Sequence, residues 1–197
     1  MPGINNGQCI PMAISSNNVY NEITISNGIL TDGSDVRIAT TIIHELIHAF
    51  LNVIRVNSGI SIPTLVGEDL SGCLANYYNG INNPLSQHNF MTDYMAPIIA
   101  AILNDMKDIL FTPLQIYRVE HPDDTTFADL RIYQPTATFP AGNSGIATPW
   151  IWSDFFMYTS YEGLQTSDAF NTIFPFGSVG KYYFDQYYRV GVLVFNP

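Results

Sequence analysis

The sequence predicts a single α+β domain, and three observations support this. Nearly half of the 197 residues are apolar, enough for one substantial core, and no change in composition divides the chain. Residues 19–29 alternate apolar and polar like a strand, whereas apolar residues in 35–56 recur at helical spacing. We therefore expect residues 1–197 to form one domain, in which a central helix packs on a small mixed sheet with a second helix behind it.

The first part of the chain supplies the sheet and the central helix. The strand at 19–29 is punctuated by turns at Asn27-Gly28 and Asp32-Gly33. The helix at 35–56 begins with Ser34 or Asp35 as its N-cap. Its apolar residues cover more than one face, which is typical of a helix buried centrally.

The middle of the chain supplies the second helix. Residues 58–91 are rich in Gly, Asn, Ser and Pro and predict mostly loop, with a short helix possible at 68–78. An apolar stripe predicts a helix at 92–110. A start near Ser86 is the alternative, and it would place a kink at Pro97.

The last third is aromatic and is divided by prolines. Residues 153–161 and 166–173 predict short helices, the second opened by a capping residue. Residues 187–195 are rich in aromatic and β-branched side chains and predict a strand. We expect this third to serve mainly as core and scaffold.

One motif carries chemistry, the run His44-Glu45-Leu-Ile-His48 inside the central helix. A spacing of four puts His44 and His48 one turn apart on one face, so both imidazoles can reach one cation. Two histidines in an apolar helix carry a desolvation cost that a metal relieves. A zinc ion lowers the pKa of a bound water to about 7, and Glu45 can take the proton as the hydroxide attacks a carbonyl. The motif predicts Zn2+ and amide hydrolysis.

A catalytic zinc site needs a third protein ligand, and two residues compete for that place. His88 lies at or just before the start of the second helix, and imidazole is a favoured zinc ligand. Glu68 follows His48 at nearly the spacing at which a glutamate completes the site in thermolysin-like enzymes. Those enzymes have a second acidic residue several positions later, whereas Asp69 follows Glu68 at once. We favour His88.

Other reactive side chains have plainer expectations. His121 precedes Pro-Asp-Asp and predicts a surface loop. Asp93 and Tyr94 follow His88 closely, where a helix cap and a packed aromatic ring are favoured over a role in the reaction. Cys9 and Cys73 form no CxxC pair and predict two separate thiols.

Charge limits the partners. The net charge is −10 with only seven scattered Lys and Arg residues, which argues against nucleic acid and against an anionic membrane surface. No apolar run is long enough to span a bilayer, and the first residues lack the pattern of a signal peptide. We expect a soluble chain that acts on a peptide or protein substrate, and that can belong to a longer protein.

Two segments together resemble a known group of proteins. They are residues 34–50, which contain the H-E-x-x-H motif, and His88-Asn-Phe-Met-Thr-Asp-Tyr-Met95; the run Tyr161-Glu-Gly-Leu-Gln-Thr adds a weaker match. They are similar to SprT-like zincins of Bacteroidetes-type bacteria and their phages, often the final domain of a long surface or secreted protein. The resemblance implies a zincin-like fold, zinc held by His44, His48 and His88, and Glu45 as the base. Gln87 and Pro97 depart from the pattern of that group.

The expected function is therefore a zinc metallopeptidase, and an amidase or cell-wall peptide hydrolase would use the same residues. The alternative from another class is a catalytically inactive structural or binding module that retains a zincin fold and a stapling metal. The intact Glu45 counts against that alternative. A toxin-type peptidase delivered by a larger carrier is a third candidate.

Overall fold

The computed structural model describes residues 7–15, 18–57, 87–122 and 130–195. In chain order the elements are β1 (Gly7–Ser15), β2 (Asn18–Ile25), α1 (Asn27–Asp32), α2 (Asp35–Asn57), α4 (Gln87–Phe90), the π-helical turn η2 (Met91–Met95), α5 (Ala96–Asp105), α6 (Lys107–Leu110), α7 (Pro113–Glu120), β3 (Ile132–Pro135), β4 (Asn143–Thr148), α8 (Trp152–Ser160), α9 (Asp168–Ile173) and α10 (Val179–Phe195). The α+β class is confirmed.

The expected mixed sheet is wrong. Within the described residues the strands form two separate antiparallel pairs, β1 with β2 and β3 with β4. Each pair joins strands that are close in sequence, and short connections allow only antiparallel pairing because a parallel pair needs a long crossover.

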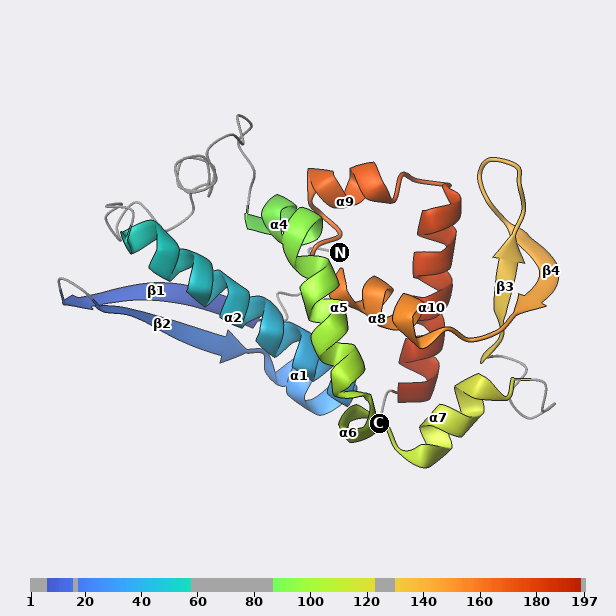
Figure 1. Ribbon diagram of the computed structural model, residues 1–197, viewed down its shortest axis with the longest axis horizontal. Coiled ribbons are helices and arrows are strands. Elements are labelled where there is room, and N and C mark those ends of the chain that lie inside the picture. The colour runs from blue at the N-terminus through green and yellow to red at the C-terminus, as the bar shows by residue number, and fades with distance from the viewer. Residues whose placement is uncertain (1–6, 16–17, 58–86, 123–129, 196–197) are drawn as a thin grey trace.

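The elements stack in a series across the molecule (Figure 1). The β1–β2 hairpin packs along α2, α2 contacts α5, α5 packs on α8, and α8 packs on α10. The second hairpin, β3–β4, contacts α10 at the far end. The predicted central helix therefore does lie between a small sheet and a second helix.

Helix α2 follows its predicted range closely. The Ile38 N–H donates to the Ser34 carbonyl at 3.0 Å, the first bond of the helix, which places Ser34 at the N-cap. The expectation of burial on every side is wrong, because Ile42, Leu46 and Phe50 are 41%, 53% and 56% exposed. The face that meets α5 and α8 lies in the apolar core, and the face toward the β1–β2 hairpin buries mainly polar side chains.

The second helix begins early, as the alternative start predicted. Helical structure starts at Gln87 and widens into η2 directly before Pro97. The Ala96 N–H donates to the Met91 carbonyl, five residues back, which is the π-helical pattern. A proline has no N–H for the ladder and its ring crowds the preceding turn, so the wider turn accommodates Pro97.

The C-terminal third contains more helix than predicted. Helices α8 and α9 confirm the two short helices, with Ser167 as the N-cap of α9. The strand at 187–195 is wrong, because these residues belong to α10. The buried residues Phe184, Tyr187, Gly191 and Val194 recur at helical spacing, so packing on α8 and β3 overrode the β-propensity of the run. Strands β1, β3 and β4 and helix α7 were not predicted, and the strand expected at 19–29 ends at Ile25, because Asn27–Asp32 form α1.

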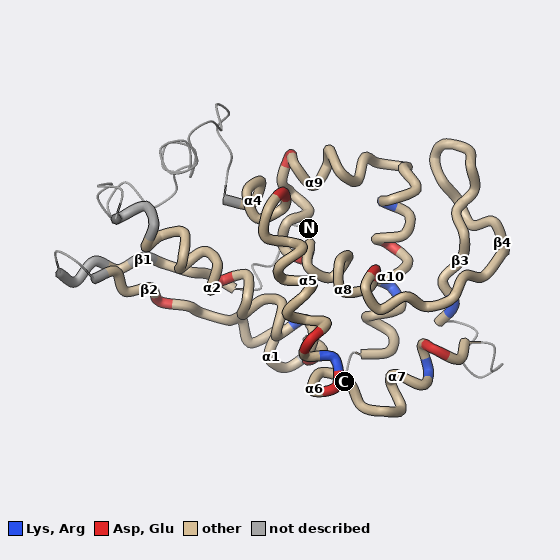
Figure 2. The backbone as a smooth tube through the Cα atoms, in the orientation of Figure 1, with Lys and Arg blue, Asp and Glu red and all other residues tan. Residues whose placement is uncertain are grey.

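The core lies mainly between α5, α8 and α10 and is strongly aromatic, as expected. The rings of Phe111, Trp152, Phe155, Phe156 and Phe195 lie within about 6 Å of one another in successive contacts. None of the described helices is long and apolar enough to cross a bilayer. Lys and Arg residues in the described parts of the chain are spread singly along the backbone (Figure 2).

Candidate functional site

Three histidines from two helices converge at one place. His44 and His48 project from α2, and His88 projects from α4. Their ring centroids lie 4.8, 5.4 and 5.4 Å apart. One nitrogen from each ring can be chosen so that all three lie within 4.8 Å of one another. The structure therefore brings together the three histidines that the sequence predicted as metal ligands.

The donor set fits a zinc ion. Tetrahedral zinc with Zn–N bonds of 2.0–2.1 Å separates two ligand nitrogens by about 3.3 Å. The Nε2 atoms of His44 and His48 are 3.0 Å apart, which is already close to that spacing. The longest separation in the cluster exceeds it by about 1.5 Å at most. Among the described residues, the group of possible ligands consists of these three imidazoles.

Burial keeps His44 and His88 in the form that binds metals. Burial, with the neighbouring His48 and His88 adding to it, lowers the pKa of His44 to about 3. Burial also lowers the pKa of His88. Both rings are therefore neutral at physiological pH, and a neutral imidazole has the lone pair that a metal needs.

Glu45 lies on the neighbouring face of α2, toward the β1–β2 hairpin. It is 5% exposed, and burial raises its pKa to about 7. A Cβ atom on Gly7, at the start of β1, would lie 2.8 Å from the Glu45 Oε1 atom and 3.0 Å from a Thr41 methyl. The absence of a side chain at Gly7 therefore leaves the space that the Glu45 carboxyl group occupies.

A buried polar cluster fixes the hairpin against α2 and so fixes Gly7. The Asn52 side chain, 3% exposed, donates to the Asn21 Oδ1 atom at 3.0 Å. Asn21 in turn donates to the Ala49 carbonyl at 3.4 Å. Cys9 lies beside the two asparagines, and burial followed by the Glu45 charge raises its pKa to about 11. Cys9 is a free, protonated thiol, as expected of an unpaired cysteine.

The other candidates that the structure describes are not part of the histidine group. Glu68 and Cys73, and the possible helix at 68–78, lie outside the described residues. His121 is exposed at the end of α7 and stacks on Tyr117, as a surface residue does. Asp93 and Tyr94 are exposed in η2, where Asp93 lies inside the turn and is not a helix cap.

Comparison with known proteins adds no relative. No family model, no curated protein and no solved structure matches this chain.

Sequence reasoning missed two glycines at the site. Gly7 gave no signal, because its contact with Glu45 exists only once the hairpin packs on α2. Gly163 has φ +84, and a Cβ there would lie 3.3 Å from the His44 ring. The run Tyr161-Glu-Gly-Leu carries a weak resemblance in the sequence, but its place beside His44 depends on the tertiary structure.

Proposed function

We propose that this chain is a zinc-dependent metallopeptidase in which His44, His48 and His88 hold Zn2+ and Glu45 is the general base. The observation that carries the proposal is the convergence of His88, from a separate helix, on the His44–His48 pair. Nothing in local helical geometry requires that convergence. A buried carboxyl group beside the first histidine supplies the one further group that hydrolysis needs.

The histidines and Glu45 have different roles in the proposed hydrolysis. Zinc, when bound, polarises a carbonyl and lowers the pKa of a water molecule. The three histidines are neutral donors, so they leave the positive charge of the ion uncompensated. The Glu45 carboxylate accepts a proton from the attacking water, whose oxygen forms the new bond to the carbonyl carbon. Glu45 then delivers that proton to the amine that leaves as the peptide C–N bond breaks.

We also propose that the fold is zincin-like and that the chain is a SprT-like zincin. Two features support this: the helix that bears H-E-x-x-H has a β-hairpin on one side, and on the other a second helical segment that supplies the third histidine. A peptide or unstructured protein is the proposed substrate, because the proposed chemistry acts on an amide carbonyl.

Elemental analysis and cleavage of an unstructured protein test the proposal. We expect one zinc per native chain, zinc without cleavage in Glu45→Gln, and neither in His88→Ala. His121→Ala is the matched control, since it removes an exposed histidine and should change nothing. A native chain that holds zinc but cleaves no peptide would favour the structural module. A native chain that holds no zinc would exclude both.

A further inference from the structure

A single segment, residues 161–169, contacts both helices that carry the candidate ligands. It connects the end of α8 to the first turn of α9. Its first part meets α2 near His44, and its last part meets α4 and η2 near His88. The segment itself contributes no histidine, so any effect it has on a metal acts through the ligands.

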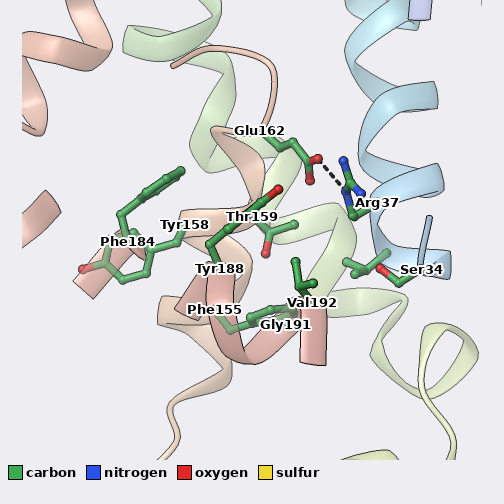
Figure 3. Close-up of a pocket in the computed structure, with 11 residues that line it drawn as sticks. Ser34, Arg37, Phe155, Tyr158, Thr159, Glu162, Phe184, Tyr188, Gly191 and Val192 are labelled. Atoms are coloured by element: carbon green, nitrogen blue, oxygen red, sulfur yellow. Dashed lines mark hydrogen bonds and ion pairs between the residues drawn. The ribbon is translucent and has the colours of Figure 1, made fainter. Parts of the chain in front are cut away.

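The contact with α2 is an ion pair. The Arg37 Nε atom donates to the Glu162 Oε1 atom at 2.7 Å, as Figure 3 shows, and the two side chains are 25% and 9% exposed. Arg37 precedes His44 by two helical turns and lies on the same face of α2. The pair therefore joins the start of the segment to the face of α2 that carries His44.

The next residue touches the ligand itself. Gly163 has φ +84, and a Cβ there would lie 3.3 Å from His44 Cε1 and 3.4 Å from Nδ1. Only a glycine combines this backbone conformation with so close an approach to the ring. The backbone at Gly163 thus forms one wall of the space in which the His44 imidazole sits.

The end of the segment holds the other helix. The Ala169 N–H donates to the Asn89 Oδ1 atom at 3.0 Å, and Asn89 directly follows His88. One turn further on, the hydroxyl groups of Thr92 and Ser167 lie 3.1 Å apart and are buried. These two bonds tie the His88 helix to the same segment that packs on His44.

From these contacts we propose that residues 161–169 position the metal ligands, with Glu162 as the principal positioning residue, acting on His44 through Gly163. The inference rests on the proposed metal site, and it adds that the site is held together from outside the two ligand helices. Groups that orient the ligands of a metal contribute about 10–100-fold to its affinity.

A purely structural role explains the ion pair poorly. Burial raises the pKa of Glu162 even though Arg37 beside it lowers that pKa, so the surroundings disfavour the charged carboxylate. The adjoining pocket is lined largely by apolar side chains, including Phe155 and Val192 (Figure 3). Apolar side chains of similar size, placed where a buried ion pair stood, often stabilise a folded protein at least as well as the ion pair does.

The decisive variant replaces the pair by apolar residues, Arg37→Met with Glu162→Leu. We expect it to unfold at a urea concentration no lower than the native chain does, yet to bind Zn2+ about 10–100-fold more weakly in a chelator competition. The absorption spectrum of bound Co2+ should change as well, because it reports the arrangement of the ligands. A native zinc affinity and cobalt spectrum in this variant would overturn the proposal.

A pair of glycine variants gives a second, independent test. Gly163→Ala and Gly145→Ala both put a side chain at positive φ, but Gly145 has no atom within 4 Å of the added Cβ. We expect both variants to lose stability and only Gly163→Ala to lose zinc affinity. Equal zinc affinity in the two variants would contradict the proposal.

These experiments separate this proposal from the proposed function. Their readout is the affinity for zinc, not the cleavage of a peptide. A native chain that binds zinc but hydrolyses nothing refutes the peptidase, and the change in affinity still decides the role of Glu162. A native chain that binds no zinc refutes both.

Discussion

Replacing Gly7 by alanine should displace the Glu45 carboxyl group and leave the three histidines in place. The added Cβ would lie 2.8 Å from Glu45 Oε1 and 2.9 Å from its Cγ. Ordinary contacts begin near 3.4 Å, so these atoms have to move by about 0.5 Å or more. The histidines project from another face of α2 and from α4, and no histidine atom is among the three nearest neighbours of the new methyl group.

The magnitude follows from which atoms must move. Two of the three crowded atoms belong to the flexible Glu45 side chain, so the loss of stability should be small, below about 1 kcal/mol. Catalysis is far more sensitive, since a misplacement of 1 Å costs about 100-fold. We expect kcat/KM to fall about 10- to 100-fold, which is about 1.4–2.7 kcal/mol of transition-state stabilisation. That loss is smaller than the roughly 100- to 10,000-fold expected from removing the base in Glu45→Gln.

The assay is cleavage of a fluorogenic peptide together with zinc content and urea unfolding of the same samples. Gly28→Ala is the matched control, because a Cβ there meets no atom within 4 Å and Gly28 is exposed at the start of α1. The control should keep full activity. Full activity in Gly7→Ala, when Glu45→Gln is inactive, would refute the reasoning. The Glu45 carboxyl group would then act from a position other than the one next to Gly7.

Three further predictions concern stability. Free zinc at about 1,000 times its Kd should stabilise the native chain by about 4 kcal/mol, and a thermal-shift assay should show this for the native chain but not for His88→Ala. Phe155→Ala should cost about 3–5 kcal/mol in urea unfolding because Phe155 is 2% exposed in the core, whereas Phe176→Ala, at an 83% exposed position, should cost less than about 0.5 kcal/mol. The third prediction is a pH dependence. Folding raises the pKa of Glu162. Its contribution to the free energy of unfolding is therefore fully present below the unfolded pKa of about 4.5, and it is lost as the pH rises through the folded pKa. The unfolding free energy of the native chain should therefore fall, relative to Glu162→Gln, as the pH rises above about 4.5, and an unchanged difference would contradict the burial of this carboxyl group.

Local patterns in the sequence were enough for the strongest helices. Helix α2 and the short helices α8 and α9 carry apolar periodicity or capping residues that act within a few residues of themselves. The strand predicted at 187–195 was wrong because contacts with distant elements, and not local preference, decide the structure there. Its aromatic and β-branched residues favour a strand, but burial of Phe184, Tyr187 and Val194 against neighbouring elements selects a helix.

The site divides in the same way. The sequence alone determined the pairing of His44 with His48, and the place of Glu45 beside them, because helical spacing fixes both. The sequence could only identify His88 as a candidate, since its contact with the His44–His48 pair depends on how the helices pack. The tertiary structure alone decided that Gly7 borders Glu45, that Gly163 borders His44, and that Glu162 reaches Arg37. Each of these contacts joins elements that meet only when the core forms, and nothing in the local sequence encodes such a meeting.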